Sequence, residues 1–545
     1  MFDLLIKNGM VIDGTGEARF TADVAITGEK IAAIEPHIPA EEARQVIDAQ
    51  GLVVAPGFID IHSHSDTYFL RDDRGESRIY QGVTTELAGQ CGSTIYPCPP
   101  EHMERIRGFA DAAVRDYASA SFGEFLEKVQ RDGKKMGTNL VPLIGHGALR
   151  CGVMGYEDRP ATKEELEEMK RLLDEDMAHG VWGLSLGLGY TPGVSSDQEE
   201  LCALGEVVAR YHGIITSHMR DQGLGTPRSL EEMYEINRRT GAHVHIAHFK
   251  ASGRAAWGKA PEFVDNVRKA QKDGIHVTVD LYPYLAASSG ITNSFPKWTI
   301  QGGKEKAVAI LQDPEKRGEI IRQLEERFST KEDGEGLYVV TTEGRYPPAD
   351  GKNIWQLSQE LELSMAETIA QVTVETQAQA TCISFAMCQE DVDYMLSQKD
   401  FAIGSDGVSL PLAPEENEGK PHPRNFGTFP CFLRLAREKG FCTLEEAVHR
   451  ITGLSARIIG LKDRGILRPG MQADITVFDG EKVTDKATYE NPFQKPEGIH
   501  HVFMAGQAAL LHGEQTDARL GRFLLKKQGV SGEYSICRFV KHIGQ

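Results

Sequence analysis

Short apolar stretches alternate with amphipathic helical stretches along most of this chain, and most of the apolar stretches end at a polar residue. The eight candidate strands end near His62, Cys91, His146, Leu186, His218, His248, Tyr282 and Asp406. In the intervening segment 163–180, an apolar stripe at helical spacing precedes a glycine stop at Gly180. Eight strand–helix units in series predict a (β/α)8 barrel, whose chemistry lies at the C-terminal ends of the strands. A doubly wound open sheet is the structural alternative.

The two ends of the chain have a different pattern. Residues 1–54 and the region from about 463 onward carry short alternating apolar runs punctuated by glycines, which is typical of antiparallel strands. We therefore expect a small β-sandwich built from residues 1–54 and 463–545, the latter including a tail without a clear period, and a catalytic barrel over 55–462. The connection after the seventh strand is unusually long, and its first part, about 285–350, is expected to be an inserted lid subdomain.

Composition excludes several classes of partner. The chain has 60 Lys and Arg against 79 Asp and Glu, a net charge of −19, which argues against binding nucleic acid or anionic membranes. No apolar run approaches the roughly 20 residues that span a bilayer. The N-terminus lacks the basic region of a signal peptide, and the nine cysteines are scattered without framework spacing. These features predict a cytoplasmic protein.

The segment APGFIDIHSH, residues 55–64, places two histidines at the end of an apolar strand. Side chains at i and i+2 of a strand share a face, so His62 and His64 point to one side. Two imidazoles on one face form half of a metal site. Taken alone, the pair has an ordinary explanation as two surface histidines after a core strand.

Four more candidate ligands lie at other strand ends. Cys91 follows the second strand in AGQCGST, and His218 and His248 end the fifth and sixth strands. These two histidines are separated by about one strand–helix repeat, so we expect them on neighbouring strands. Asp406 ends the eighth strand in IGSDG. Each residue alone has a structural explanation, but their coincidence at strand ends predicts a zinc site with a carboxylate beside it.

Several of these motifs also resemble a known family. The segments KNGMVIDGTG, APGFIDIHSHSD, QGVTTELAGQCGST, TSHMRDQG, IAHFKASG and IGSDG resemble the amidohydrolase superfamily. Cys91, a cysteine in place of the bridging lysine of other members, narrows the resemblance to the N-acyl-D-amino-acid deacylases, also called D-aminoacylases. The resemblance covers residues 1 to about 525. It implies a (β/α)8 barrel with a small β-sandwich, a zinc site and deacylation of N-acyl-D-amino acids.

The resemblance also implies roles for the candidate ligands. Carried over by motif, Cys91, His218 and His248 hold a tightly bound Zn²⁺. A second, weaker position is formed by His62, His64 and Asp406, with Cys91 bridging.

Four further residues are candidates for binding the substrate. Lys250 shares the face of His248 if the strand continues, Tyr282 ends the seventh strand, and Arg424 follows the eighth. A lysine, a phenol and an arginine near a metal could bind a substrate carboxylate, and the resemblance implies that they grip the α-carboxylate. Ser288 could line the side-chain pocket. The segment between Asp406 and Arg424 is longer and more acidic than the family pattern, which leaves the position of Arg424 open.

Two other polar residues receive a structural interpretation. Arg220, two residues after His218, is expected to pair with an acidic neighbour. His146 is expected to make a supporting hydrogen bond rather than to bind metal.

The expected reaction is metal-assisted amide hydrolysis in which Asp406 takes a proton from water and delivers it to the leaving amine. Three alternatives stay open. A cyclic amidase of the dihydroorotase or hydantoinase type would use the same barrel, although the fourth strand, GVWGLSLGLGY, contains no lysine. A narrower N-acyl-D-glutamate or N-acyl-D-aspartate deacylase, or a D-peptidase, is the second. A non-catalytic scaffold is the third. The preferred side chain, the acyl group, the number of metals and the oligomeric state stay open at this point.

Overall fold

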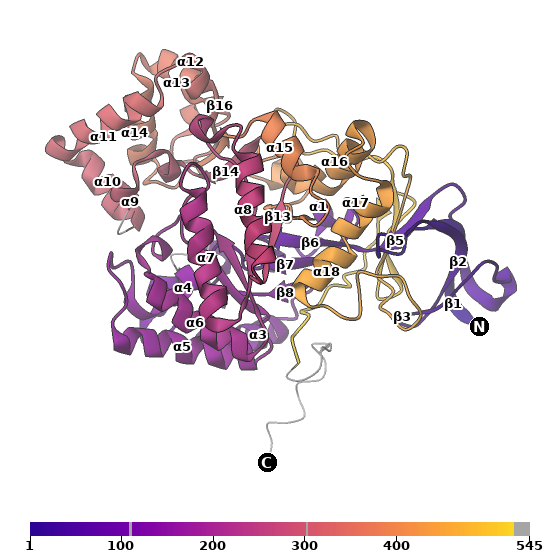
Figure 1. The fold of residues 1–545 in the computed structure, drawn as a ribbon. Helices are drawn as coiled ribbons and strands as arrows, with labels where there is room; N and C mark the ends of the chain where they lie inside the picture. The colour runs from indigo at the N-terminus through magenta and orange to yellow at the C-terminus, as the bar shows by residue number, and fades with distance from the viewer. Residues whose placement is uncertain (108–111, 301–302, 528–545) are drawn as a thin grey trace.

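The computed structural model describes residues 1–107, 112–300 and 303–527. Parallel strands form the centre of the protein (Figure 1), and they are arranged in a ring. The strands of the ring are β6 (Phe58–Ser63), β7 (Val83–Ala88), β8 (Asn139–Pro142), β9 (Ile144–Gly145), β10 (Gly183–Gly187), β11 (Ile214–His218), β12 (His243–Ile246), β13 (Val277–Leu281) and β18 (Ala402–Ile403). They pair in two arcs, β6-β7-β8 and β9-β10-β11-β12-β13-β18. Because β8 and β9 are consecutive pieces of the third strand, the ring has eight strands.

Backbone hydrogen bonds join the two arcs into a closed barrel. The amide of Leu143, between β8 and β9, donates to the carbonyl of Ala88 at 3.0 Å. On the other side, the amide of Asp406 donates to the carbonyl of His62, and that of His64 to Gly407, each at 2.8 Å. The sequence therefore predicted the (β/α)8 barrel correctly, and the open doubly wound sheet is excluded.

Helices surround the barrel and follow its strands (Figure 1). They are α1 (Glu76–Ile79), α2 (Met103–Arg107), α3 (Phe122–Arg131), α4 (His146–Met154), α5 (Lys163–Ala178), α6 (Gln198–Arg210), α7 (Thr226–Thr240), α8 (Ala260–Lys272), α15 (Gln389–Leu396), α16 (Arg424–Lys439), α17 (Leu444–Arg450) and α18 (Gly453–Ile459). Helix α5 shows why they form: Thr162 and Glu165 make a capping box at its start. Met169, Leu172 and Leu173 bury its apolar stripe, as the 3.6-residue period predicts.

Both ends of the chain contribute to a small β-sandwich beside the barrel. Its strands are β1 (Phe2–Val11), β2 (Phe20–Thr27), β3 (Lys30–Glu35), β4 (Ala43–Asp48), β5 (Val53–Pro56), β19 (Ile475–Phe478), β20 (Ile499–Met504), β21 (Gln507–Leu511) and β22 (Glu514–Gln515). The two ends meet where β5 pairs antiparallel with β19. Ile6, Val24 and Val477 are fully buried in one cluster. Their neighbours Leu5 and Ala25 are buried in a second cluster, so these strands are covered on both faces instead of alternating between buried and exposed residues.

After β22 the chain returns to the barrel, a course that the sequence pattern did not indicate. The amide of Leu524 donates to the carbonyl of Leu140 at 2.8 Å, and the indole of Trp182 donates to the carbonyl of Leu524 at 2.6 Å. The ring of Phe523 packs against those of Phe122 and Phe125. This segment therefore contributes to the barrel's outer core. The rest of the tail, 528–545, lies outside the described residues.

The long connection between β13 and β18 forms a subdomain with its own core. Its elements are β14 (Ala286–Gly290), α9 (Lys297–Ile300), α10 (Gly303–Gln312), α11 (Pro314–Arg327), α12 (Lys331–Glu335), β15 (Leu337–Thr341), β16 (Lys352–Asn353), α13 (Ile354–Leu361), α14 (Met365–Glu375) and β17 (Thr381–Phe385). The sheet order is β14-β17-β15-β16, and Ile320, Leu324 and Ile369 are fully buried in its core. Because β17 pairs with β14, the insertion extends past residue 350 to Phe385.

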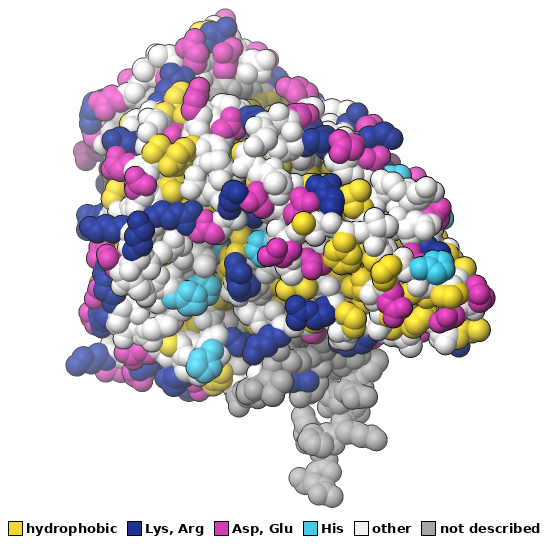
Figure 2. All heavy atoms as spheres, turned by 45° about the vertical axis from the view of Figure 1, so that its right-hand side comes forward, with side chains coloured by type: hydrophobic (Ala, Val, Ile, Leu, Met, Phe, Trp, Pro, Cys, Tyr) yellow, Lys and Arg dark blue, Asp and Glu magenta, His cyan; other side chains and the backbone are white. Residues whose placement is uncertain are grey.

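Charges of both signs are mixed on the face of the molecule that Figure 2 shows, with Lys and Arg side chains beside Asp and Glu. Among residues 1–107, 112–300 and 303–527, no helix combines the length and apolar character needed to cross a bilayer.

Candidate metal centre

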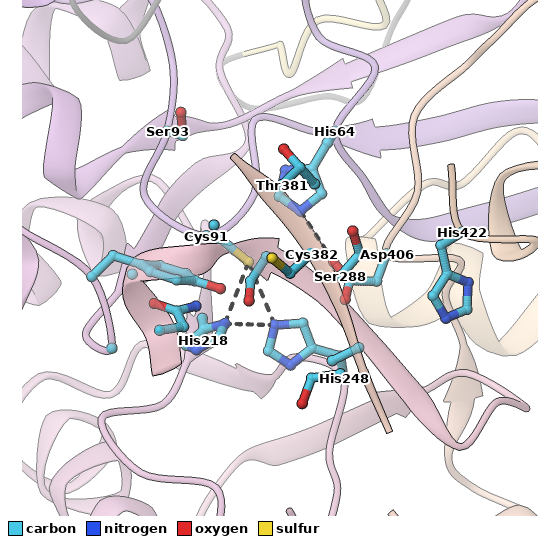
Figure 3. Close-up of a pocket in the computed structure, with 18 of the residues that line it drawn as sticks. His64, Cys91, Ser93, His218, His248, Ser288, Thr381, Cys382, Asp406 and His422 are labelled. Atoms are coloured by element: carbon cyan, nitrogen blue, oxygen red, sulfur yellow. Dashed lines mark hydrogen bonds and ion pairs between the residues drawn. The ribbon is translucent and has the colours of Figure 1, made fainter. Parts of the chain in front are cut away.

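The barrel brings all six candidate ligands together at the C-terminal ends of its strands. They form two overlapping groups that share one thiol: His62, His64, Cys91 and Asp406, and Cys91, His218 and His248. Within each group the possible ligand atoms lie within 4.8 Å of one another. Figure 3 shows Cys91, His218, His248, His64 and Asp406 pointing into one cavity.

The group around Cys91, His218 and His248 has the spacing of a metal site. The Sγ of Cys91 lies 3.8 Å from Nδ1 of His218 and 3.5 Å from Nε2 of His248, and these two nitrogens are 2.9 Å apart. Zinc bonds of about 2.0–2.3 Å in a tetrahedron separate neighbouring donor atoms by roughly 3.3–3.6 Å. One thiolate and two imidazoles also form a donor set that zinc prefers. The residues present therefore fit a zinc ion.

The second group lies on the other side of the same sulfur. Nε2 of His62 is 3.5 Å from the Sγ of Cys91 and 3.5 Å from Oδ1 of Asp406. Nε2 of His64 is 3.1 Å from the same carboxylate oxygen. Cys91 is thus the central donor of the whole cluster, and it is placed where it could bridge two ions.

Electrostatics favour the ionised forms of the two acidic donors. Burial opposes ionisation of Cys91, but the imidazoles of His248, His62 and His218 outweigh it and hold the thiol pKa well below its ordinary value. Burial likewise opposes ionisation of Asp406, yet Arg424 and the neighbouring imidazoles keep its pKa well below the usual range. Both groups are therefore anionic at neutral pH.

Three of the six candidate ligands have left-handed backbone conformations. The φ angles are +55° at Cys91, +38° at His248 and +53° at Asp406. For residues with a side chain this region is sparsely populated and costs on the order of 1–3 kcal/mol. Each residue follows a barrel strand directly or closely, so the turn redirects its side chain over the barrel mouth. Backbone strain of this kind clusters at functional sites.

Asp280, a buried carboxylate on β13, supports two of the histidines. Its Oδ1 accepts from the backbone amide of His248 at 2.8 Å, and its Oδ2 lies 2.8 Å from Nε2 of His245 and 3.6 Å from Nδ1 of His62. Burial opposes its ionisation, but His62 and His245 hold its pKa well below the ordinary value. The sequence pattern does not single out Asp280. Its signal was a lone aspartate inside the apolar run VTVDLY.

Two cations lie beside the candidate ligands: Nζ of Lys250 is 3.0 Å from Nδ1 of His248, and Arg424 contacts Asp406. Lys250 is two residues after His248, and Arg424 is the first residue of α16. Both lie over the ring of Tyr282, at 5.2 and 5.3 Å from its centroid. Arg424 also donates to Oδ2 of Asp406 at 2.7 Å. All three side chains are almost completely buried. Despite the long acidic segment before it, Arg424 therefore reaches the site.

A cavity of about 1210 Å³ lies between the barrel mouth and the inserted subdomain. The barrel provides the metal-ligand candidates, and the paired strands β14 and β17 provide small side chains opposite them, including Ser288, Thr381 and Cys382 (Figure 3). The ring of Tyr190, in the loop after β10, lies 4.4 Å from that of His218. Tyr190 was missed because it belongs to a loop without a period.

Two expected supporting residues have structural partners. The guanidinium of Arg220 pairs with Glu232 at 2.9 Å. Nε2 of His146 lies 2.7 Å from Oε1 of Glu200, and His146 is absent from both ligand groups of the described residues. These contacts agree with the structural interpretation given to each residue.

Comparison with known proteins relates the chain to one family over most of its length. The model of the amidohydrolase family matches residues 45–312 and 419–509. A D-aminoacylase from Alcaligenes xylosoxydans xylosoxydans is 32% identical over 530 residues, covering 96% of this chain and 98% of that protein.

Solved structures give a consistent result. An N-acyl-D-glutamate deacylase from Bordetella bronchiseptica, complexed with zinc and a phosphonate inhibitor, has a TM-score of 0.81 at 29% identity, covering 96% of this chain and 99% of that one. A D-aminoacylase studied for its binuclear metal centre, with activation by one metal and attenuation by a second, has a TM-score of 0.81 at 30% identity. The matched region covers 97% of this chain and 100% of the D-aminoacylase chain.

Proposed function

Because the chain belongs to the amidohydrolase family, we propose that it is a zinc-dependent hydrolase of N-acyl-D-amino acids, which releases a carboxylate and a free D-amino acid. The observation that carries this proposal is the position of Cys91 among His62, His218 and His248, with two cations beside these ligands in the same cavity. A metal ligand set and a carboxylate-binding corner are the two parts that such a substrate requires.

Cys91, His218 and His248 would hold the tightly bound ion, and His62, His64 and Asp406 would complete a weaker second position through Cys91. When bound, zinc lowers the pKa of water toward about 7 and polarises the acyl carbonyl. The second position is proposed as accessory, since three good donors and an open coordination position suffice for hydrolysis.

Asp406 would act as the general base and then as the general acid. Its carboxylate is ionised, as its lowered pKa requires, and it faces the ligand cluster through His64 at 3.1 Å. It would take the proton of the attacking water and deliver it to the nitrogen of the leaving amine. The hydrogen bond from Arg424 to Oδ2 orients the carboxylate and leaves Oδ1 toward the cluster.

Lys250, Tyr282 and Arg424 would bind the α-carboxylate of the substrate. Two cations and a phenol in a buried corner provide charge-assisted hydrogen bonds that hold the substrate in one orientation. With the carboxylate in this corner and the acyl carbonyl at the metal, the side chain must point toward the small residues of β14 and β17, among them Ser288. Three fixed directions at one carbon select one enantiomer.

The alternatives are less consistent with the site. Among the described residues, β10 offers no lysine that could be carboxylated to bridge two metals, so a cyclic amidase is disfavoured. A non-catalytic scaffold would not be expected to keep six converging donors. A deacylase restricted to acidic side chains stays the second candidate, because one similar structure is an N-acyl-D-glutamate deacylase.

The free cysteines and the net charge support a compartment and a class of partner. Eight cysteines of the described part of the chain are free, which supports a reducing compartment, so we propose the cytoplasm. A net charge of −19 supports a small-molecule substrate rather than a nucleic acid.

A panel of N-acetyl-D-amino acids and N-acetyl-L-amino acids, assayed together with metal analysis, tests the proposal. We expect about one tightly bound zinc per chain and hydrolysis of D-substrates at least about a hundredfold faster than of their L-enantiomers. Equal rates for both enantiomers, or activity that survives complete zinc removal, would contradict it.

A further inference from the structure

His422 is a buried side chain at the edge of the cavity that the proposed mechanism does not use. It is 1% exposed, and Figure 3 shows it beside Asp406 on the side away from the metal ligands. It precedes α16 by two residues and lines the cavity wall.

Both ring nitrogens of His422 have defined hydrogen-bond partners. Nε2 lies 3.0 Å from the carbonyl oxygen of Ala286, which can only accept, so Nε2 carries the proton. Nδ1 accepts from the backbone amide of Arg424 at 3.0 Å. Burial and the nearby Arg424 charge lower the pKa of His422 well below its ordinary value, so the ring is neutral and holds this one tautomer.

These two hydrogen bonds connect separate parts of the fold. Ala286 is the first residue of β14 and lies two residues before Ser288, whereas Arg424 is the first residue of α16. The first amides of a helix have no partner within the helix, so the acceptor at Nδ1 determines where α16 begins. The side chain of Arg424 then donates to Asp406.

Two aromatic rings hold the imidazole in place. Tyr284, just before β14, lies 5.2 Å from His422 at an interplanar angle of 89°. Tyr489, from the loop between β19 and β20, lies 5.1 Å away at 78° and also contacts Phe385 at the end of β17. The ring therefore sits at the junction of the inserted subdomain, α16 and the C-terminal loop.

We propose that His422 is a positioning residue that sets the guanidinium of Arg424 for the substrate carboxylate and couples its position to that of the inserted subdomain. The inference rests on the proposed function, in which Arg424 binds that carboxylate. His422 touches neither substrate nor metal in this scheme, and it acts through the amide of Arg424.

The test compares two substrates that differ only in the carboxylate: the N-acetyl-D-amino acid that the enzyme hydrolyses fastest, and its carboxamide. The readout is the ratio of kcat/KM for the acid to kcat/KM for the amide, measured on zinc-loaded enzyme. His422→Phe keeps the ring but removes both hydrogen bonds. His422→Asn leaves a larger void beside the tyrosines but keeps an acceptor near Nδ1.

We expect His422→Phe to lower the ratio at least about tenfold, mainly through KM for the acid, because a buried amide without an acceptor relaxes the start of α16. His422→Asn should keep the ratio within about threefold of wild type. This variant should still unfold at a lower denaturant concentration than wild type, because of the void beside the tyrosines. A purely structural role predicts the reverse order, since Asn disturbs packing more. An unchanged ratio in His422→Phe, or an equal fall in both variants, overturns the proposal.

Arg424→Gln separates this inference from the function on which it rests. It should lower the same ratio, and His422→Phe added to it should cause no further fall, because both changes act through one guanidinium. If Arg424→Gln lowers the ratio and His422→Phe does not, only the role of His422 is overturned. If Arg424→Gln leaves the ratio unchanged, the carboxylate assignment fails, and the positioning role fails with it.

Discussion

Replacing Asp406 by Asn separates proton transfer from metal binding and from folding. Asp406 contacts the ligand cluster through Oδ1 and Arg424 through Oδ2, at 3.1 Å from His64 and 2.7 Å from Arg424. An asparagine oxygen still accepts from Arg424, so the buried guanidinium keeps a partner and the fold should be retained. Asparagine cannot take a proton from water.

Loss of a general base costs about 10²–10⁴ in rate, which corresponds to roughly 2.7–5.4 kcal/mol of transition-state stabilisation at 1.36 kcal/mol per tenfold. We therefore expect kcat of Asp406→Asn to be at least about a hundredfold lower than that of wild type. The tight zinc site should stay full, because Cys91, His218 and His248 need no atom of Asp406.

The assay is amine release with metal content measured on the same preparation. Glu343→Gln, which neutralises another carboxylate at the cavity wall, is the matched control and should stay within about twofold of wild type. A variant Asp406→Asn that keeps more than about a tenth of wild-type kcat with full zinc would refute the assignment of the base.

Three further predictions follow from the geometry. Burial lowers the pKa of Lys250 to about 8, so its charge is present below that pH and lost above it. KM should therefore rise above pH 8, and Lys250→Arg, which stays charged, should lack this rise; the same rise in both enzymes would contradict the role. Asp280→Asn should weaken zinc affinity about 10–100-fold in a chelator competition, because the Asp280 carboxylate supports His62 and His248. An unchanged zinc affinity would contradict this supporting role. Phe429→Ala, at a fully buried core ring, should lower the free energy of unfolding in urea by about 3–5 kcal/mol with kcat unchanged, and a loss below about 1 kcal/mol would show that the core adapts.

The sequence predicted the convergence of distant residues because a barrel imposes it. Parallel strands of one barrel end on the same side, so polar residues at strand ends must meet. Strand parity placed His62 and His64 on one face, and the spacing of His218 and His248 placed them on neighbouring strands, as β11 and β12 are. Neither placement depends on the path of the loops.

The features that were missed depend on non-local contacts. Asp280 has the local pattern of any strand residue, and its role comes from contacts with His245 on the neighbouring strand β12 and with His248 just after that strand. The full extent of the insertion leaves no local periodicity, because β17 pairs with β14 although helices α9 to α14 and strands β15 and β16 lie between them in the sequence. Tyr190 depends in the same way on the path of a loop.

X-ray absorption at the zinc edge tests the central claim most directly, because it reports the ligands of the ion itself. We predict one sulfur at about 2.3 Å together with nitrogen or oxygen neighbours at about 2.0–2.1 Å. In Cys91→Ser, the sulfur contribution should disappear. A protein that binds zinc through nitrogen and oxygen alone, or active enzyme without any metal, would contradict the account.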